Sequence, residues 1–205
     1  MGGAVRVTAV VAMFLAAGTG VPRAAVILDS LVVRVYDNAG VLADHRARAI
    51  KSAHEILTRA ELAVEWHDCP AGGVRLRRDC AAVPAPEELS VRLVRSPRRT
   101  AGDRALGNAL IDSSTGKGTL ATVFVDRIEA MAARGPIDAW SVVGRVMAHE
   151  IGHLLLGTNS HSDTGVMREI WTLKDLVRDR PHDWVFSNTQ RETLRSWRLA
   201  PRATG

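Results

Sequence analysis

Residues 149–167 read HEIGHLLLGTNSHSDTGVM, and the rest of the chain is best understood from this segment. It begins with an H-E-x-x-H motif that runs from His149 to His153. On an α-helix, residues four apart point nearly the same way and lie about 6 Å apart along the axis, so both imidazoles can reach one small ion. Glu150 can reach a water bound to that ion. The motif therefore predicts a Zn²⁺ site that activates water for hydrolysis, with Glu150 as the catalytic base.

Apolar residues flank the motif on both sides, at Val142, Val143, Val146, Met147, Ile151 and Leu154 to Leu156. A helix with such flanks is expected to be buried, and a buried His/Glu/His cluster needs a partner because unpaired polar groups are costly inside a protein. Gly157 then follows as a glycine that can end the helix in the left-handed conformation. These features disfavour a solvated surface helix that matches the motif by accident.

The segment resembles the metzincin clan of zinc peptidases, whose long motif is H-E-x-x-H-x-x-G-x-x-H followed by a Met-turn. His149, Glu150 and His153 match this motif residue by residue, and Met167 fits the methionine of the Met-turn. Within the clan it is most similar to secreted bacterial matrixin-like proteins. The resemblance implies a zinc metalloendopeptidase with an α+β, zincin-like fold: a twisted mixed sheet of about five strands, a backing helix, an active-site helix and a C-terminal helix.

The spacing of the third ligand departs from the metzincin pattern. The family places five residues between its second and third histidines, whereas seven lie between His153 and His161. His161 is still the expected third metal ligand, because it follows the turn at Gly157 and is followed at once by residues 162–167.

Acidic residues after the histidines keep other ligand sets open. Asp163 is the alternative third ligand, since related clans use an aspartate there. Glu169 or Asp175 would serve if a following helix supplied the ligand. In each version Zn²⁺ keeps a fourth position for water, and the resemblance implies that Met167 forms an apolar floor beneath the metal without binding it.

The N-terminus has the pattern of an export signal. Arg6 supplies a positive charge, residues 7–17 are apolar, and this run is shorter than the about 20 residues that a membrane-spanning helix needs. Residues 1–25 are therefore expected to be a signal peptide, and residues 26–205 a single catalytic domain. This predicts a protein that is secreted or held in the periplasm or cell envelope, without stable membrane insertion.

Hydrophobic patterns in the remaining chain predict a mixture of strands and helices. Strand character occurs at residues 26–36, 62–66, 88–95, 105–112 and 119–125. Helical character occurs at residues 43–60, 126–134, 139–156 and 189–199, and the third of these helices carries the H-E-x-x-H motif. The first strand, helix and second strand predict a βαβ unit. The resemblance implies that 105–112 is an edge strand that pairs with extended substrate.

Two further features concern single side chains. Cys69 and Cys80 bracket a short loop, and two cysteines in an exported chain most often form a disulfide. The alternative is that these thiols bind a metal or keep the enzyme latent. A single pair of cysteines at the spacing of Cys69 and Cys80 gives poor geometry for zinc. Packing in the core is the expected role of the C-terminal tryptophans, although Trp171 follows Met167 closely enough to line a specificity pocket.

The charge balance is basic, with 27 Lys and Arg residues against 22 Asp and Glu residues. The arginines are dispersed rather than gathered on one face with aromatic residues, which argues against a nucleic-acid partner. The expected partner is a peptide or protein substrate, bound by a monomer. Two non-enzymatic alternatives stay open: a secreted zinc protein that binds without cutting, and a basic envelope-binding module whose H-E-x-x-H motif is accidental.

Overall fold

The computed structural model describes residues 30–70, 78–96 and 105–199. The predicted signal peptide, residues 1–25, lies outside the described residues, as do residues 26–29 of the first expected strand.

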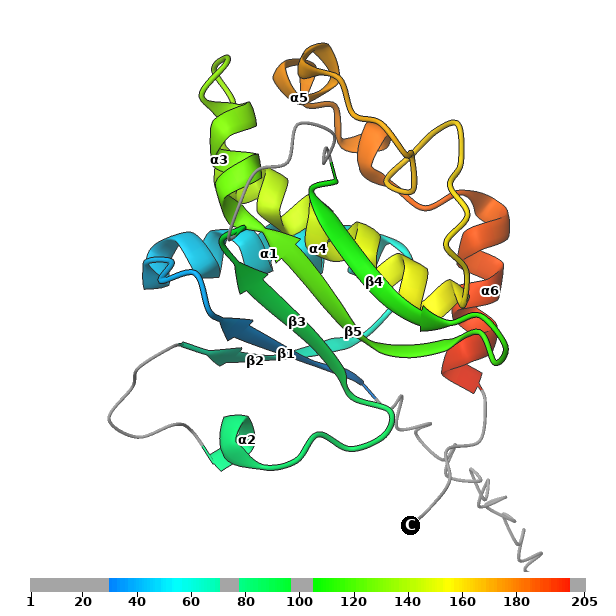
Figure 1. Ribbon diagram of the computed structural model, residues 1–205. Coiled ribbons are helices and arrows are strands. Elements are labelled where there is room, and N and C mark those ends of the chain that lie inside the picture. Colours follow the sequence, from blue (N-terminus) through cyan, green and yellow to red (C-terminus); the bar gives the residue numbers. More distant parts are fainter. Residues whose placement is uncertain (1–29, 71–77, 97–104, 200–205) are drawn as a thin grey trace, which may run out of the picture.

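Within the described residues, five strands form one sheet (Figure 1). They are β1 (Leu31–Asp37), β2 (Val64–Cys69), β3 (Leu89–Val94), β4 (Gly107–Asp112) and β5 (Lys117–Phe124). Their order across the sheet is β2-β1-β3-β5-β4. The expected α+β fold with a five-stranded mixed sheet is confirmed. The second strand extends further than its apolar pattern predicted, because its residues up to Cys69 pair with β1.

The sheet is parallel except at one edge. β1 pairs in parallel with β2 and β3, and β3 pairs in parallel with β5. Parallel neighbours need a crossover connection, and helix α1 (Ala43–Arg59) supplies it between β1 and β2, as the predicted βαβ unit requires. A tight turn containing Gly116, with φ of 65°, joins β4 to β5, so this pair is antiparallel. β4 therefore lies at the sheet edge.

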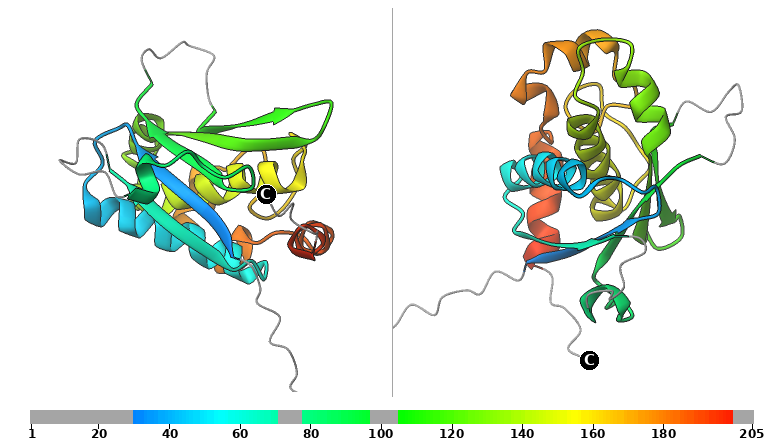
Figure 2. Two further views of the ribbon diagram at one scale, coloured as in Figure 1. Left: turned by 90° about the horizontal axis from the view of Figure 1, so that it is seen from below. Right: turned by 90° about the vertical axis from the view of Figure 1, so that its left-hand side faces the viewer.

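Two long helices, α1 and α4 (Ala139–Leu156), pack side by side on one face of the sheet (Figures 1 and 2). Beneath them are the alternating apolar side chains of two central strands, buried at Leu31, Val33, Val35, Leu89, Val91 and Leu93. Gly144 lets the two helices approach closely, since a Cβ at this position would lie 2.3 Å from the Ala49 carbonyl oxygen. Because α4 is enclosed on several sides, it is apolar around most of its circumference.

The other helices are short or peripheral. They are α2 (Arg78–Ala81), α3 (Val125–Ala132), α5 (Leu173–Arg178), the 3₁₀ helix η1 (Pro181–Trp184) and α6 (Asn188–Leu199). α3 and α6 lie where the sequence predicted helices, whereas α5 and η1 were not predicted because they are too short to show a helical period. No helix in the described ranges is long and apolar enough to cross a membrane.

The predicted disulfide between Cys69 and Cys80 is present, with Cα atoms 5.6 Å apart. It joins the end of β2 to α2, on the sheet face opposite α1 and α4 (Figure 2). Arg34 fixes the same segment to β1, because its guanidinium donates to the Ala82 carbonyl over 2.7 Å and pairs with Glu88.

Candidate metal centre

Helix α4 carries the H-E-x-x-H motif in the interior of the molecule. The helix begins after Asp138, whose carboxylate accepts a hydrogen bond from the Trp140 N–H, and it ends at Gly157, with φ of 65°. Both ends are the cap types that the residues favour. The motif side chains His149, Glu150 and His153 are all buried.

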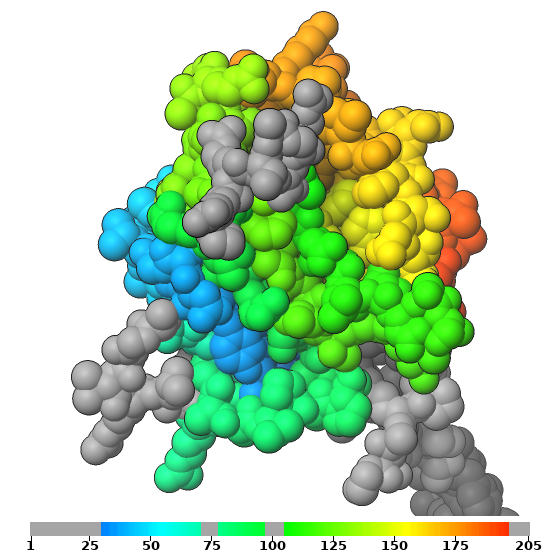
Figure 3. All heavy atoms as spheres, viewed as in Figure 1, coloured from blue at the N-terminus to red at the C-terminus, as the bar shows by residue number. Residues whose placement is uncertain are grey.

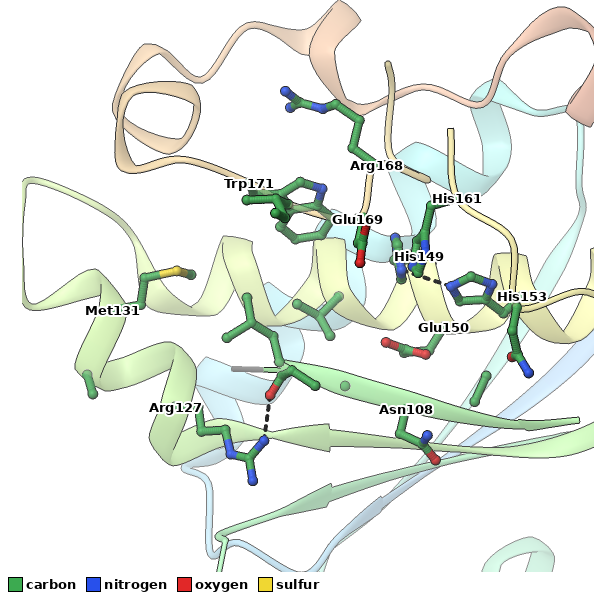
Figure 4. Close-up of a pocket in the computed structure, with 18 of the residues that line it drawn as sticks. Asn108, Arg127, Met131, His149, Glu150, His153, His161, Arg168, Glu169 and Trp171 are labelled. Carbon is green, nitrogen blue, oxygen red and sulfur yellow. Dashed lines mark hydrogen bonds between the residues drawn. The ribbon is translucent and has the colours of Figure 1, made fainter. Parts of the chain in front are cut away.

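Three histidines converge at one end of a cavity (Figure 4). The Nε2 atoms of His149 and His153 are 3.0 Å apart. His161, from the loop after α4, brings a ring nitrogen that lies within 4.8 Å of both. Three nitrogens around one tetrahedral Zn²⁺ lie about 3.3 Å from one another, so the spacing of this group fits one zinc ion.

Backbone carbonyls fix the tautomers of the two helical histidines. His149 Nδ1 lies 2.8 Å from the Val166 carbonyl oxygen, and His153 Nδ1 lies 2.7 Å from that of Thr158. A carbonyl can only accept, so each Nδ1 carries a proton and each neutral ring has its lone pair on Nε2. Two lone pairs 3.0 Å apart repel each other unless a cation lies between them. The donor set therefore fits a divalent metal, with carbonyls orienting the ligands from behind.

Protonation of one imidazole could also relieve the repulsion between the two Nε2 lone pairs, but both rings are neutral. Burial lowers the pKa of His149 to about 4, although the bond to the Val166 carbonyl acts in the opposite direction. Burial also lowers the pKa of His153. Both rings are therefore neutral near pH 7, which is the form that binds a metal ion.

The candidate third ligands lie in different environments. In the part of the chain that the structure describes, the metal-binding group consists of the three histidines without a carboxylate. Asp163 is exposed and outside this group, and Glu169 lines the cavity without joining it. Asp175 instead caps α5, where its carboxylate accepts from the N–H and hydroxyl of Thr172. The geometry favours His161.

The seven-residue connection has a structural reason. α4 continues through Leu156 and turns at Gly157, after which Thr158 supplies the carbonyl that orients His153. The Thr158 hydroxyl then accepts from the Ser160 N–H over 3.1 Å, so the chain turns back and brings His161 to the other two histidines. The added residues therefore extend the helix and form this turn.

Met167 packs directly against the helix that carries the motif. It is fully buried, and a Cβ on Gly152 would lie 2.5 Å from its sulfur. Its carbonyl accepts from the Ser162 N–H over 2.9 Å, which closes the loop after His161. Gly165 enables this turn with φ of 77°. The sulfur contacts the helix between the two motif histidines.

A cavity of about 1020 Å³ opens beside the histidines. Figure 3 shows the β4–β5 hairpin and the segment after α4 side by side on one surface, where Gly116 and Gly157 touch. Asn108 and Asn159 line the cavity, as do residues of α3, among them Met131. The sequence did not identify these residues, because only the fold brings α3 and β4 to α4.

Glu150 and Trp171 shape the cavity next to His149 (Figure 4). Burial raises the pKa of Glu150 to about 8. Trp171 lines the cavity, as predicted, and its ring meets His149 edge to face, with centroids 5.7 Å apart. Trp184 supports Trp171 from behind at 5.1 Å between ring centroids.

Comparisons with known proteins place the fold. No known protein family matches the sequence, and no curated protein matches it either. Several solved structures are similar, among them the following two. The archaemetzincin of Methanopyrus kandleri has a TM-score of 0.52 and 17% identity, over 88% of this chain and 99% of that chain. A zinc-dependent peptidase of Methanocorpusculum labreanum has a TM-score of 0.51 and 18% identity, over 79% of this chain and 99% of that chain.

At these sequence identities, the structural similarity shows a shared fold. The finer resemblance to matrixin-like proteins stays a prediction. The chain has a zincin, metzincin-like fold, shared with structures described as an archaemetzincin and a zinc-dependent peptidase.

Proposed function

We propose that this protein is a zinc-dependent endopeptidase. The observation that carries the proposal is the pair of neutral imidazoles whose Nε2 lone pairs face each other at 3.0 Å, within a group of three histidines. The fold shared with zinc-dependent peptidases supports the same function. When bound, Zn²⁺ polarises a peptide carbonyl and lowers the pKa of a water molecule.

Each polar residue of the site has a distinct role in this proposal. His149, His153 and His161 hold the metal through neutral ring nitrogens. Glu150 takes a proton from the attacking water at its carboxylate and passes it to the leaving nitrogen of the substrate. Burial raises the pKa of Glu150 to about 8 without a metal, and a nearby divalent cation would lower it again toward the ionised form that a base needs.

The edge strand β4 offers a backbone template for the substrate. The Leu106 carbonyl accepts from the Phe124 N–H over 2.9 Å. Hydrogen-bonded and non-bonded pairs alternate in an antiparallel ladder, so the N–H and C=O groups of Gly107 and Ala109 point away from β5. Both residues line the cavity. An extended peptide can add to this edge beside Glu150.

The cavity extends from Glu150 toward α3 (Figure 4). Its walls there combine the apolar residues Leu106, Met131, Val146 and Trp171 with Arg127. The apolar part favours a substrate with an apolar side chain next to the scissile bond, because the side chain leaves water on binding.

The proposal includes export. The apolar N-terminal pattern of residues 1–25 supports it, and so does the Cys69–Cys80 disulfide, since such bonds persist in oxidising compartments. Cell fractionation of a bacterial expression host, with mass spectrometry of the N-terminus, tests this point, and a protein that stays in the cytoplasm with Met1 retained would contradict it.

Cleavage of a mixed peptide library, with and without a chelator, tests the enzymatic proposal. The wild-type protein is expected to cut, to stop cutting when zinc is removed, and to recover when zinc is restored. Glu150→Ala should keep zinc and lose at least about 100-fold in kcat, because general base catalysis contributes about 10²–10⁴-fold. Turnover that survives in Glu150→Ala would remove Glu150 from its role, and zinc binding without any cleavage would favour a binding protein.

A further inference from the structure

Gly107, the first residue of β4, lies directly against the carboxylate of Glu150. A Cβ placed on Gly107 would lie 2.4 Å from Glu150 Oε1 and 2.8 Å from Glu150 Cγ. It would also lie 2.8 Å from a methyl carbon of Val146. Real Cβ atoms do not come this close to other heavy atoms, so the Glu150 side chain occupies the space that any side chain at position 107 would take.

Hydrogen bonds do not explain where this carboxylate lies. In the described part of the chain no group donates a hydrogen bond to Glu150, and burial alone accounts for the shift in its pKa. Glu150 is 5% exposed, so packing against its neighbours fixes its position. One of these neighbours, on the side of the sheet, is Gly107.

The backbone of Gly107 has a second role on the opposite side. Its N–H and C=O belong to the edge of β4 that has no partner strand among the described residues, next to the cavity. A peptide that adds to this edge therefore hydrogen-bonds the same residue against which Glu150 packs. Gly107 thus contacts both the substrate backbone and the catalytic carboxylate.

We propose that Gly107 is a positioning residue for Glu150: its missing side chain forms the slot that holds the carboxylate, while its backbone holds the substrate at the same level. This inference rests on the proposed peptidase function. Gly107 is not among the glycines with positive φ, so its backbone accepts alanine. The need for glycine therefore comes from the space that Glu150, together with a methyl group of Val146, occupies.

Gly107→Ala tests the slot, with Gly135→Ala as the matched control. A Cβ on Gly135 would have no neighbour closer than the 3.6 Å contact with Val177. We expect Gly107→Ala to lower kcat by about 100-fold, the cost of a displacement of about 1 Å, while KM stays within about twofold. Zinc content should remain that of the wild type, and Gly135→Ala should change neither constant. An unchanged kcat in Gly107→Ala, or a rise in KM alone, overturns the proposal.

A double-mutant cycle followed by thermal unfolding measures the contact between Gly107 and Glu150 independently of enzymatic activity. Gly107→Ala should lower the melting temperature of the metal-free protein, and this loss should shrink when Glu150→Ala removes the carboxylate. An equal loss in both backgrounds overturns the slot. If Gly107→Ala alone does not fold, the double variant must fold for the proposal to stand. Chelator-sensitive cleavage by the wild type tests the proposed function separately, so the two failures are distinguishable.

Discussion

At the scale of single residues, the tautomers of His149 and His153 determine what the site can bind. The Nδ1–H of each ring donates a hydrogen bond to a main-chain carbonyl, which leaves the Nε2 lone pairs of both rings directed at one point. The histidine spacing in the sequence predicts that the rings share a helix face. The carbonyls of Val166 and Thr158 could not be predicted, because the turns that place them depend on packing against α4.

Asp175 gives a prediction about acid stability at the same scale. The hydrogen bond from the Thr172 hydroxyl, supported by Arg168 and Arg178, lowers the pKa of Asp175 below its ordinary value of 3.8. A carboxyl whose pKa is lower in the folded state adds stability above its unfolded pKa and loses it as the pH falls through the folded pKa. Asp175→Asn should therefore weaken the fall in unfolding free energy below about pH 4 in urea titrations. An unchanged acid slope would contradict this assignment.

At the scale of elements, Arg46 connects α1 to the ends of two strands. Its guanidinium donates to Asp68 over 2.8 Å and to Asp37 over 3.3 Å. Asp37 is 3% exposed, so removal of Arg46 leaves a buried carboxylate without its cation. Arg46→Ala should cost about 3–5 kcal/mol of unfolding free energy in urea denaturation. Arg48 lies on the same helix as Arg46 and forms an exposed ion pair with Asp138. Arg48→Ala removes this pair and should cost at most about 1 kcal/mol of unfolding free energy. Similar losses in both variants would contradict a buried ion pair.

The element scale also shows what patterns in the sequence can predict. The bounds of α4 follow from its own residues, because Asp138 and Gly157 cap it locally. α5 also has a local capping box, formed by Thr172 and Asp175, but is too short to show a helical period, whereas η1 depends on contacts outside its own residues. η1 is held by the Trp184 N–H, which donates to Asp179 over 3.2 Å, and by Arg145 of α4, whose guanidinium lies over the Trp184 ring. Such contacts leave no periodic signal in the local sequence.

At the scale of the whole molecule, the sheet divides the structural disulfide from the metal centre. The Cys69–Cys80 bond closes a segment on one face, and α4 packs against the other (Figure 2). Removal of the bond in Cys69→Ser/Cys80→Ser should lower the unfolding free energy by about 3 kcal/mol in the chain-entropy account of a short loop. Zinc content and the H-E-x-x-H geometry should be unaffected. Loss of zinc from a variant that is still folded would show that the two faces are coupled.

The whole fold also explains why some site residues escaped prediction. The hydrophobic patterns predict five strands, and the resemblance to metzincins implies that they form a mixed sheet with residues 105–112 at its edge. The approach of Gly107 to Glu150, 43 positions later, depends on the packing of β4 against α4. Met131 likewise reaches the cavity only because α3 follows β5 at the end of the cavity.

The most direct test of the central claim is the zinc content of the purified mature protein, compared with His161→Ala and Asp163→Ala. The three-histidine site predicts about one zinc per wild-type chain, with most of it lost in His161→Ala and kept in Asp163→Ala. Zinc that is kept in His161→Ala and lost in Asp163→Ala would move the third ligand. A wild-type protein that binds no zinc after reconstitution would contradict the metal centre itself.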